Sequence, residues 1–177
     1  AFSGIRSFTS YPTVAKLSVP STTLTAGTMD LYRFSVAASS GGNGIGLFQV
    51  TANIATSSAS TVSGTTTVTS MKVYAYTDAG FSNPVASFTN GQVVATVTSL
   101  ANSGDNDGQF SAILQIPAGT TYYFKITGTV TLTSGTGTFS GSVTTRLGGD
   151  STYPTLASSA TVQMAVQSSV DGNANGD

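Results

Sequence analysis

The residue types that most often carry catalysis are absent from this chain. It contains no His, Cys or Glu, and all seven of its acidic residues are Asp. General acid–base chemistry and activated nucleophiles rely mainly on those missing types. Asp105 and Asp107 are two residues apart, but they lie in the polar, glycine-flanked stretch Ser103–Gly108, which is typical of a turn. We therefore expect that the protein is not an enzyme.

Oxygen-bearing side chains near the end of the sequence could bind a hard cation. They follow the first half of the calcium-loop pattern D-x-[DN]-x-[DN]-G, in which alternate oxygens converge on Ca²⁺ and the glycine allows a sharp bend. The second half of the pattern is not present, and a flexible polar tail, the interpretation we favour, has the same composition. Asp105 and Asp107 are a weaker candidate for the same ion. The expected ligands in the tail are Asp171, Asn173, Asn175 and Asp177.

Three tyrosines alternate with apolar residues, which would place them on the outer face of a sheet. They are Tyr74, Tyr76 and Tyr123. Exposed rings of this kind can stack on sugars, which would suit an adhesin or a carbohydrate-binding module. Packing across strands, or burial beneath a neighbouring subunit, is the commoner role of such rings, and we favour it.

The composition points to a secreted protein whose solubility does not depend on charge. Of 177 residues, only 7% are charged, compared with roughly 25% in typical soluble domains. Ser and Thr together make up nearly a third of the chain. The net charge is −1 and the six cations are scattered, which argues against nucleic acid as a partner. No apolar run approaches the roughly 18 residues that span a bilayer, so we expect no membrane insertion. Ala1 is typical of the residue left after a secretion signal is removed.

The elements that would position these residues are short strands. Apolar residues alternate with polar ones through most of the chain, and turn residues recur at intervals typical of antiparallel sandwiches and barrels. We expect an all-β fold, an antiparallel β-sandwich of about ten strands, either Ig-like or jelly-roll-like. The expected strands outside the hairpin described next are Thr13–Val19, Asp30–Ala37, Ile45–Ala55, Thr67–Thr77, Val85–Phe88, Gln92–Thr98, Phe110–Ile116 and Ala160–Gln167.

The clearest stretch of alternation runs from Thr120 to Leu147. Its first half places Tyr122, Phe124 and Ile126 on one face, and two glycines at Ser134–Gly137 interrupt the pattern before a second alternating half. Glycines suit the positive φ angles of a tight reversal. We therefore predict a long hairpin here, and a second, shorter one at Asn90-Gly91.

The expected domain, residues 13–167, is flanked by an extended N-terminal arm, residues 1–12, and a polar tail, residues 168–177. Such an arm can add a strand to the open sheet edge of a neighbour. Monomeric sheets usually protect their edges with charge, and this chain has little charge to use. Closure by local loops would explain the same composition. The expected assembly residues of the arm are Phe2, Ile5, Phe8 and Tyr11.

Three short runs resemble segments of Ser/Thr-rich β-sandwich surface proteins of candidate-phylum bacteria, of the surface-layer or extracellular-filament kind. They are Val73–Val85 (VYAYTDAGFSNPV), Ile116–Phe124 (IPAGTTYYF) and Val170–Asn173 (VDGN). The resemblance implies a structural role at the cell surface and no catalytic residue. In its strand content and arm the chain is also similar to secreted subunits that polymerise by donating a strand.

Taken together, these features predict a secreted protein whose main partner is itself. We expect a subunit of a filament or surface layer, joined by exchange of strands or arms, with Ca²⁺ as the one candidate cofactor. The alternative is a monomeric adhesin or carbohydrate-binding module whose partner is a surface glycan.

Overall fold

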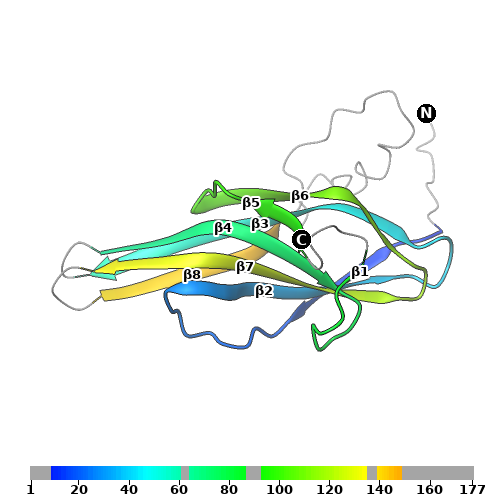
Figure 1. Ribbon diagram of the computed structural model, residues 1–177, viewed down its shortest axis with the longest axis horizontal. Coiled ribbons are helices and arrows are strands. Elements are labelled where there is room, and N and C mark those ends of the chain that lie inside the picture. Colours follow the sequence, from blue (N-terminus) through cyan, green and yellow to red (C-terminus); the bar gives the residue numbers. More distant parts are fainter. Residues whose placement is uncertain (1–8, 61–63, 87–92, 135–138, 149–177) are drawn as a thin grey trace, which may run out of the picture.

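The computed structural model describes residues 9–60, 64–86, 93–134 and 139–148 (Figure 1). These residues form an all-β structure of eight strands. Their bounds are β1 (Pro12–Leu17), β2 (Gly27–Ala38), β3 (Ile45–Ser60), β4 (Gly64–Tyr76), β5 (Val93–Val97), β6 (Ser103–Ile116), β7 (Thr121–Ser134) and β8 (Phe139–Gly148).

The strands form two antiparallel sheets of unequal width. The five-stranded sheet has the order β1-β2-β7-β4-β5, and the three-stranded sheet has the order β6-β3-β8. Buried side chains from both sheets form one hydrophobic core. This arrangement is compatible with a β-sandwich. The open edges within the described part are therefore β1 and β5 of the wide sheet, and β6 and β8 of the narrow one.

The core follows from the alternation read in the sequence. In β7 the even-numbered residues Phe124, Ile126 and Val130 are buried, whereas the odd-numbered side chains Tyr123 and Lys125 are not. Phe124 is paired with Phe34 of β2, and their rings stack with centroids 5.0 Å apart. Because side chains alternate across a strand, each strand contributes one apolar face to the core.

A bulge in β4 shifts by one residue which of its side chains face the core. Val68 and Met71 are both fully buried although they are three residues apart, which a regular strand would not allow. The register with β7 shifts between Thr69 and Met71, and Ser70, at the shift, has a φ of 49°. The bulge thus lets Thr66 and Val68 share the inner face with Met71 and Val73.

The predicted long hairpin is wrong. β7 pairs with β2 and β4 in the wide sheet, whereas β8 pairs with β3 in the narrow one. The preceding pair, β3 and β4, crosses between the sheets in the same way. The strand ends at both crossings lie together, since Ser60 is paired with Phe139 and Gly64 with Ser134. A turn sequence allows a reversal, but it does not decide whether the returning strand pairs with its predecessor or joins the facing sheet.

Other expectations also change. Residues 103–108 belong to β6 and are not a turn. Of the expected strand Val85–Phe88, residues 85 and 86 are described and are not in a strand, but they follow an isolated bridge between Tyr76 and Pro84. The expected strand Gln92–Thr98 is confirmed as β5 over Val93–Val97. The expected strand Thr13–Val19 is present as β1, which begins at Pro12 and ends at Leu17. The Asn90-Gly91 turn and the strand Ala160–Gln167 lie outside the described residues.

Candidate functional site

Aromatic rings gather on the outer face of the five-stranded sheet. We call this group, Tyr74, Tyr76, Phe81 and Tyr123, the ring cluster. Tyr76 and Tyr123 are cross-strand partners, and Phe81 packs edge-on against both, with centroid distances of 5.4 Å to Tyr76 and 6.4 Å to Tyr123. Tyr76 is buried because the Phe81 loop covers it, which agrees with the favoured interpretation of packing across strands and not with a ring open to sugars.

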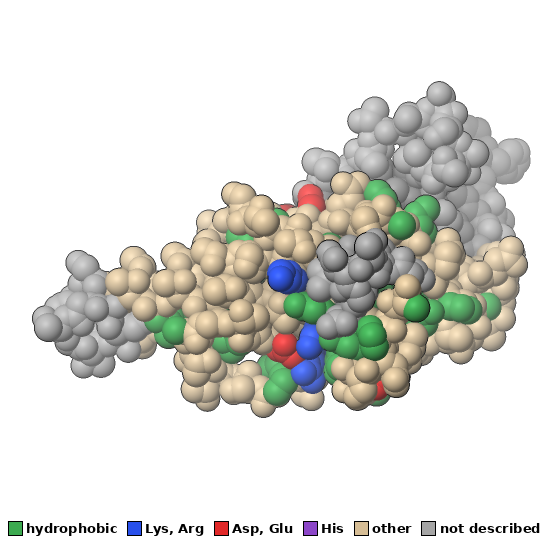
Figure 2. Space-filling model, in the orientation of Figure 1, with side chains coloured by type: hydrophobic (Ala, Val, Ile, Leu, Met, Phe, Trp, Pro, Cys, Tyr) green, Lys and Arg blue, Asp and Glu red, His purple; other side chains and the backbone are tan. Residues whose placement is uncertain are grey.

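Cations cover the rings. Lys125 Nζ lies 5.1 Å from the centroid of Tyr74 and 5.4 Å from that of Tyr76, and Arg33 Cζ lies 4.3 Å from that of Phe81. Arg33 also forms a 2.6 Å ion pair with Asp30. In Figure 2, basic and acidic side chains lie beside hydrophobic ones near the middle of a surface that is otherwise mostly tan. These contacts favour packing across strands over an open platform for sugars.

A tight loop places Phe81 in the ring cluster. The Asp78 carboxylate accepts hydrogen bonds from the backbone N–H groups of Gly80, Ser82 and Asn83, at distances down to 2.6 Å for Asn83. These bonds lower the pKa of Asp78, with the Asn83 N–H the largest cause. They also hold Phe81 at a φ of 56°, a conformation uncommon for a bulky side chain. The turn predicted around Phe81 is thus present, and it has a structural role.

Asp105 and Asp107 share the exposed face of β6, where each accepts a hydrogen bond from β3. Asn53 Nδ2 donates to Asp105 Oδ1 at 2.9 Å, and Thr51 Oγ1 donates to Asp107 Oδ1 at 2.6 Å. Within the described ranges, no three His, Cys, Asp or Glu side chains are close enough together to hold a metal. These contacts account for both carboxylates as cross-strand polar pairs.

The remaining metal and arm candidates fall mostly outside the described part of the chain. That is true of all four tail ligands, Asp171, Asn173, Asn175 and Asp177, and of Phe2, Ile5 and Phe8 in the arm. The calcium site therefore stays a prediction.

Only the last residues of the arm are described, and they are bound to the domain. Ser39 donates its backbone N–H to the Tyr11 carbonyl at 3.1 Å, and its hydroxyl accepts from the Tyr11 N–H at 3.1 Å. Ser10 Oγ donates to the Gly41 carbonyl at 2.7 Å. These bonds hold Ser10 and Tyr11 against the domain.

The β1 edge is one of the open strand edges that the described residues present. We use this name for β1 together with Tyr11. β1 pairs on one side only, with β2, and its residues from Pro12 to Lys16 are all exposed. Tyr11 is 61% exposed and Val14 is 51% exposed, while Lys16 is the one charged residue of β1. The sequence predicted this strand, but its place at an edge depends on which strands pair.

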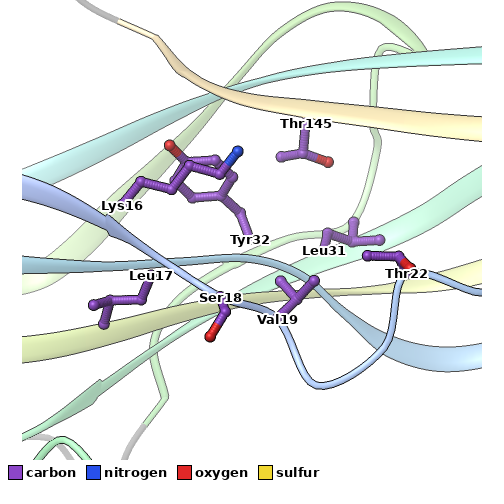
Figure 3. A pocket seen from close by; sticks show the side chains of 8 residues that line it. All are labelled: Lys16, Leu17, Ser18, Val19, Thr22, Leu31, Tyr32 and Thr145. Atoms are coloured by element: carbon purple, nitrogen blue, oxygen red, sulfur yellow. The ribbon is translucent and has the colours of Figure 1, made fainter.

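A small groove opens between the two sheets, where β1 and β2 approach β8. Its volume is about 280 Å³. Figure 3 shows the side chains of Lys16, Leu31, Tyr32 and Thr145 around this groove. Lys16 Nζ lies 5.7 Å from the centroid of the Tyr32 ring. No sequence motif marks this groove, because its residues come from three separate segments. The main lining side chains are Lys16, Leu17, Val19, Leu31, Tyr32 and Thr145.

No protein-family model and no curated protein sequence matches this chain. Among the described residues, no helix has the length and apolar character needed to cross a bilayer.

Proposed function

We propose that this protein is an extracellular structural subunit that assembles with copies of itself into a filament or surface layer. Copies join by strand addition, in which an extended segment of one copy pairs with the β1 edge of the next. The domain that is linked in this way is a β-sandwich of the Ig-like or jelly-roll-like kind.

The β1 edge carries this proposal. An edge strand offers unpaired backbone N–H and C=O groups to any other strand, and monomeric proteins usually protect such edges with charge, proline or a covering element. β1 has Pro12 at its first position and a single charge at Lys16, yet Val14 and the adjacent Tyr11 leave apolar surface exposed. Exposed apolar surface beside unpaired backbone favours a partner strand.

The composition supports the same function and the extracellular location. Hydroxyl groups take the place of charges over much of this chain, so faces of two copies can approach without desolvating many ions. The resemblance of residues 73–85 and 116–124 to surface proteins of candidate-phylum bacteria points in the same direction.

The test is electron microscopy of the purified chain, with and without millimolar Ca²⁺, beside three variants. Val14→Lys places a charge on the β1 edge, and Thr65→Lys places the same charge on an exposed position of β4, away from the β1 edge. A third variant lacks residues 1–8 and keeps the contacts of Ser10 and Tyr11.

We expect ordered filaments or sheets from the intact chain and from Thr65→Lys. Val14→Lys should abolish them, and loss of residues 1–8 should do the same if the arm is the donated strand. Uniform single particles for every variant and condition would contradict the proposal and favour the alternative, a monomeric adhesin or carbohydrate-binding module. Binding to an array of surface glycans would then be the next measurement.

A further inference from the structure

The groove beside β8 marks an incomplete place in the narrow sheet. Within the described residues β8 has one strand neighbour, β3, and residues of β1 and β2 line the groove together with Thr145 of β8. Thr145 of β8 lines this space, and its hydroxyl oxygen is buried without a hydrogen-bond partner. A buried polar group without a partner costs free energy, so the hydrogen-bonding capacity of Thr145 is not satisfied by the described residues.

The groove is poorly suited to a small molecule. Its volume of about 280 Å³ is at or below the smallest typical ligand pockets, about 300 Å³. Much of its lining is aliphatic, from Leu17, Val19 and Leu31. Space of this shape between two sheets suits a few apolar side chains that enter from a strand alongside.

We propose that the segment Ala160–Gln167 of the same molecule fills this groove, lying antiparallel beside β8 as a fourth strand of the narrow sheet. Its sequence, ATVQMAVQ, alternates Val162, Met164 and Val166 with mostly polar residues and contains no charge. One face would enter the groove against Thr145. The other face would continue the exposed outer surface of β8, where Ser142 and Thr144 lie.

The connection to β8 favours this segment. β8 ends at Gly148, and residues 149–159 lead from there to Ala160. That length is ample for a reversal onto the neighbouring strand position, which in a sheet is only about 4.8 Å away. A tethered segment has an effective concentration of about the millimolar order, so it outcompetes copies in dilute solution.

The N-terminal arm fits the groove less well. Its large residues recur every third position, so Phe2 and Phe8 would face one side of a strand while Ile5 and Tyr11 faced the other. Only one of these pairs could enter a one-sided groove. The bonds of Ser10 and Tyr11 also tie the end of the arm to residues 39–41.

Disulfide trapping in the full chain tests the proposal, because the native sequence has no cysteine. Thr144→Cys, on the exposed face of β8, is combined in turn with Thr161→Cys, Gln163→Cys or Ala165→Cys. The matched control combines the same three changes with Thr65→Cys, which is exposed on β4. After mild oxidation in dilute solution, mass spectrometry identifies the linked peptides, and non-reducing gels separate bonds within a molecule from bonds between molecules.

We expect a disulfide within one molecule in at least one Thr144→Cys combination, and several-fold less in the controls. Bonds formed only between molecules would overturn the proposal and would show that this segment is exchanged between copies. Equal yields with Thr65→Cys, or no disulfide, would also overturn it.

A second measurement examines the face that enters the groove. Val162→Asp should lower the midpoint of thermal unfolding by about 5 °C or more, whereas Gln163→Asp should leave it nearly unchanged. Equal effects would contradict the proposed orientation.

This inference does not depend on assembly, because both measurements are made on dilute single molecules. If it holds, the β8 edge is closed within each copy. The contacts proposed above then involve β1, and failure of one proposal leaves the other standing.

Discussion

Asn106 is a buried amide that joins three parts of the backbone. Its Nδ2 group donates to the carbonyls of Ala52, Ala101 and Gly104 at 3.0 to 3.3 Å, and its Oδ1 accepts from the Ala101 N–H at 2.8 Å. Asn102 nearby accepts from the Val68 N–H at 2.6 Å. Together these amides fix the connection between β5 and β6 against β3 and β4.

Asn106→Ala should therefore destabilise the protein by about 1–3 kcal/mol, because it leaves buried backbone groups without partners. The loss is measured from the midpoint of urea unfolding. Asn53→Ala removes an exposed amide from the neighbouring strand and should change the free energy of unfolding by about 0.5 kcal/mol or less. Similar losses for the two variants would show that Asn106 has no special role.

The loop at Asp78 makes stability depend on pH in a defined direction. The backbone donors hold the pKa of Asp78 below its ordinary value of 3.8 in the folded state, so the folded protein favours the ionised carboxylate. The stabilisation is fully present above pH 3.8 and is lost as the pH falls through the folded pKa.

Asp78→Asn should thus lower the thermal midpoint of unfolding at pH 6. Below pH 3 the difference in thermal midpoint between the variant and the native chain should be smaller, because the native carboxylate is then protonated. The measurement is a series of thermal unfolding curves across this range. A difference that stays constant with pH would contradict the assignment of the effect to the ionised carboxylate.

At the scale of elements, the bulge at Ser70 decides which side chains of β4 reach the core. A strand without the extra residue would place Val68 and Met71 on opposite faces. The positive φ of 49° at Ser70 is costly for β-branched side chains and free of that cost for glycine.

Ser70→Val should therefore destabilise the protein by about 1–3 kcal/mol, whereas Ser70→Gly should be close to neutral. Thr69→Val, at the exposed neighbouring position in ordinary strand conformation, is the matched control and should have little effect. Chemical unfolding compares the three variants. Equal stability of the valine and glycine variants would mean that the bulge relaxes at little cost.

At the scale of the whole molecule, the charges and the apolar surface are unevenly placed. Arg33, Lys125 and Asp30 are engaged around the ring cluster of the wide sheet. The β1 edge, by contrast, has Lys16 alone beside exposed Val14. With this single charge, the β1 edge has little of the charge that usually protects an edge strand. The microscopy experiment tests the β1 edge, and the disulfide experiment separately tests the groove beside β8.

The sequence by itself determined where most of the strands lie and which face of most strands is buried. Alternation is a local property, so Phe124 and Ile126 could be assigned to the core, and Asp78 to a turn, without knowledge of the partners. The same patterns predicted β5 and the second half of β6, although β6 begins at Ser103 and not at Phe110.

Only the tertiary structure decided how the strands are paired. The crossing of β7 to β8, the edge position of β1 and the inclusion of Asp105 in β6 all depend on contacts between residues far apart in the chain. Alternation specifies a face but not a neighbour, and a turn sequence is compatible with either sheet. The β1 edge and the groove at Thr145 exist only where separate strands meet, so no local pattern could have revealed them.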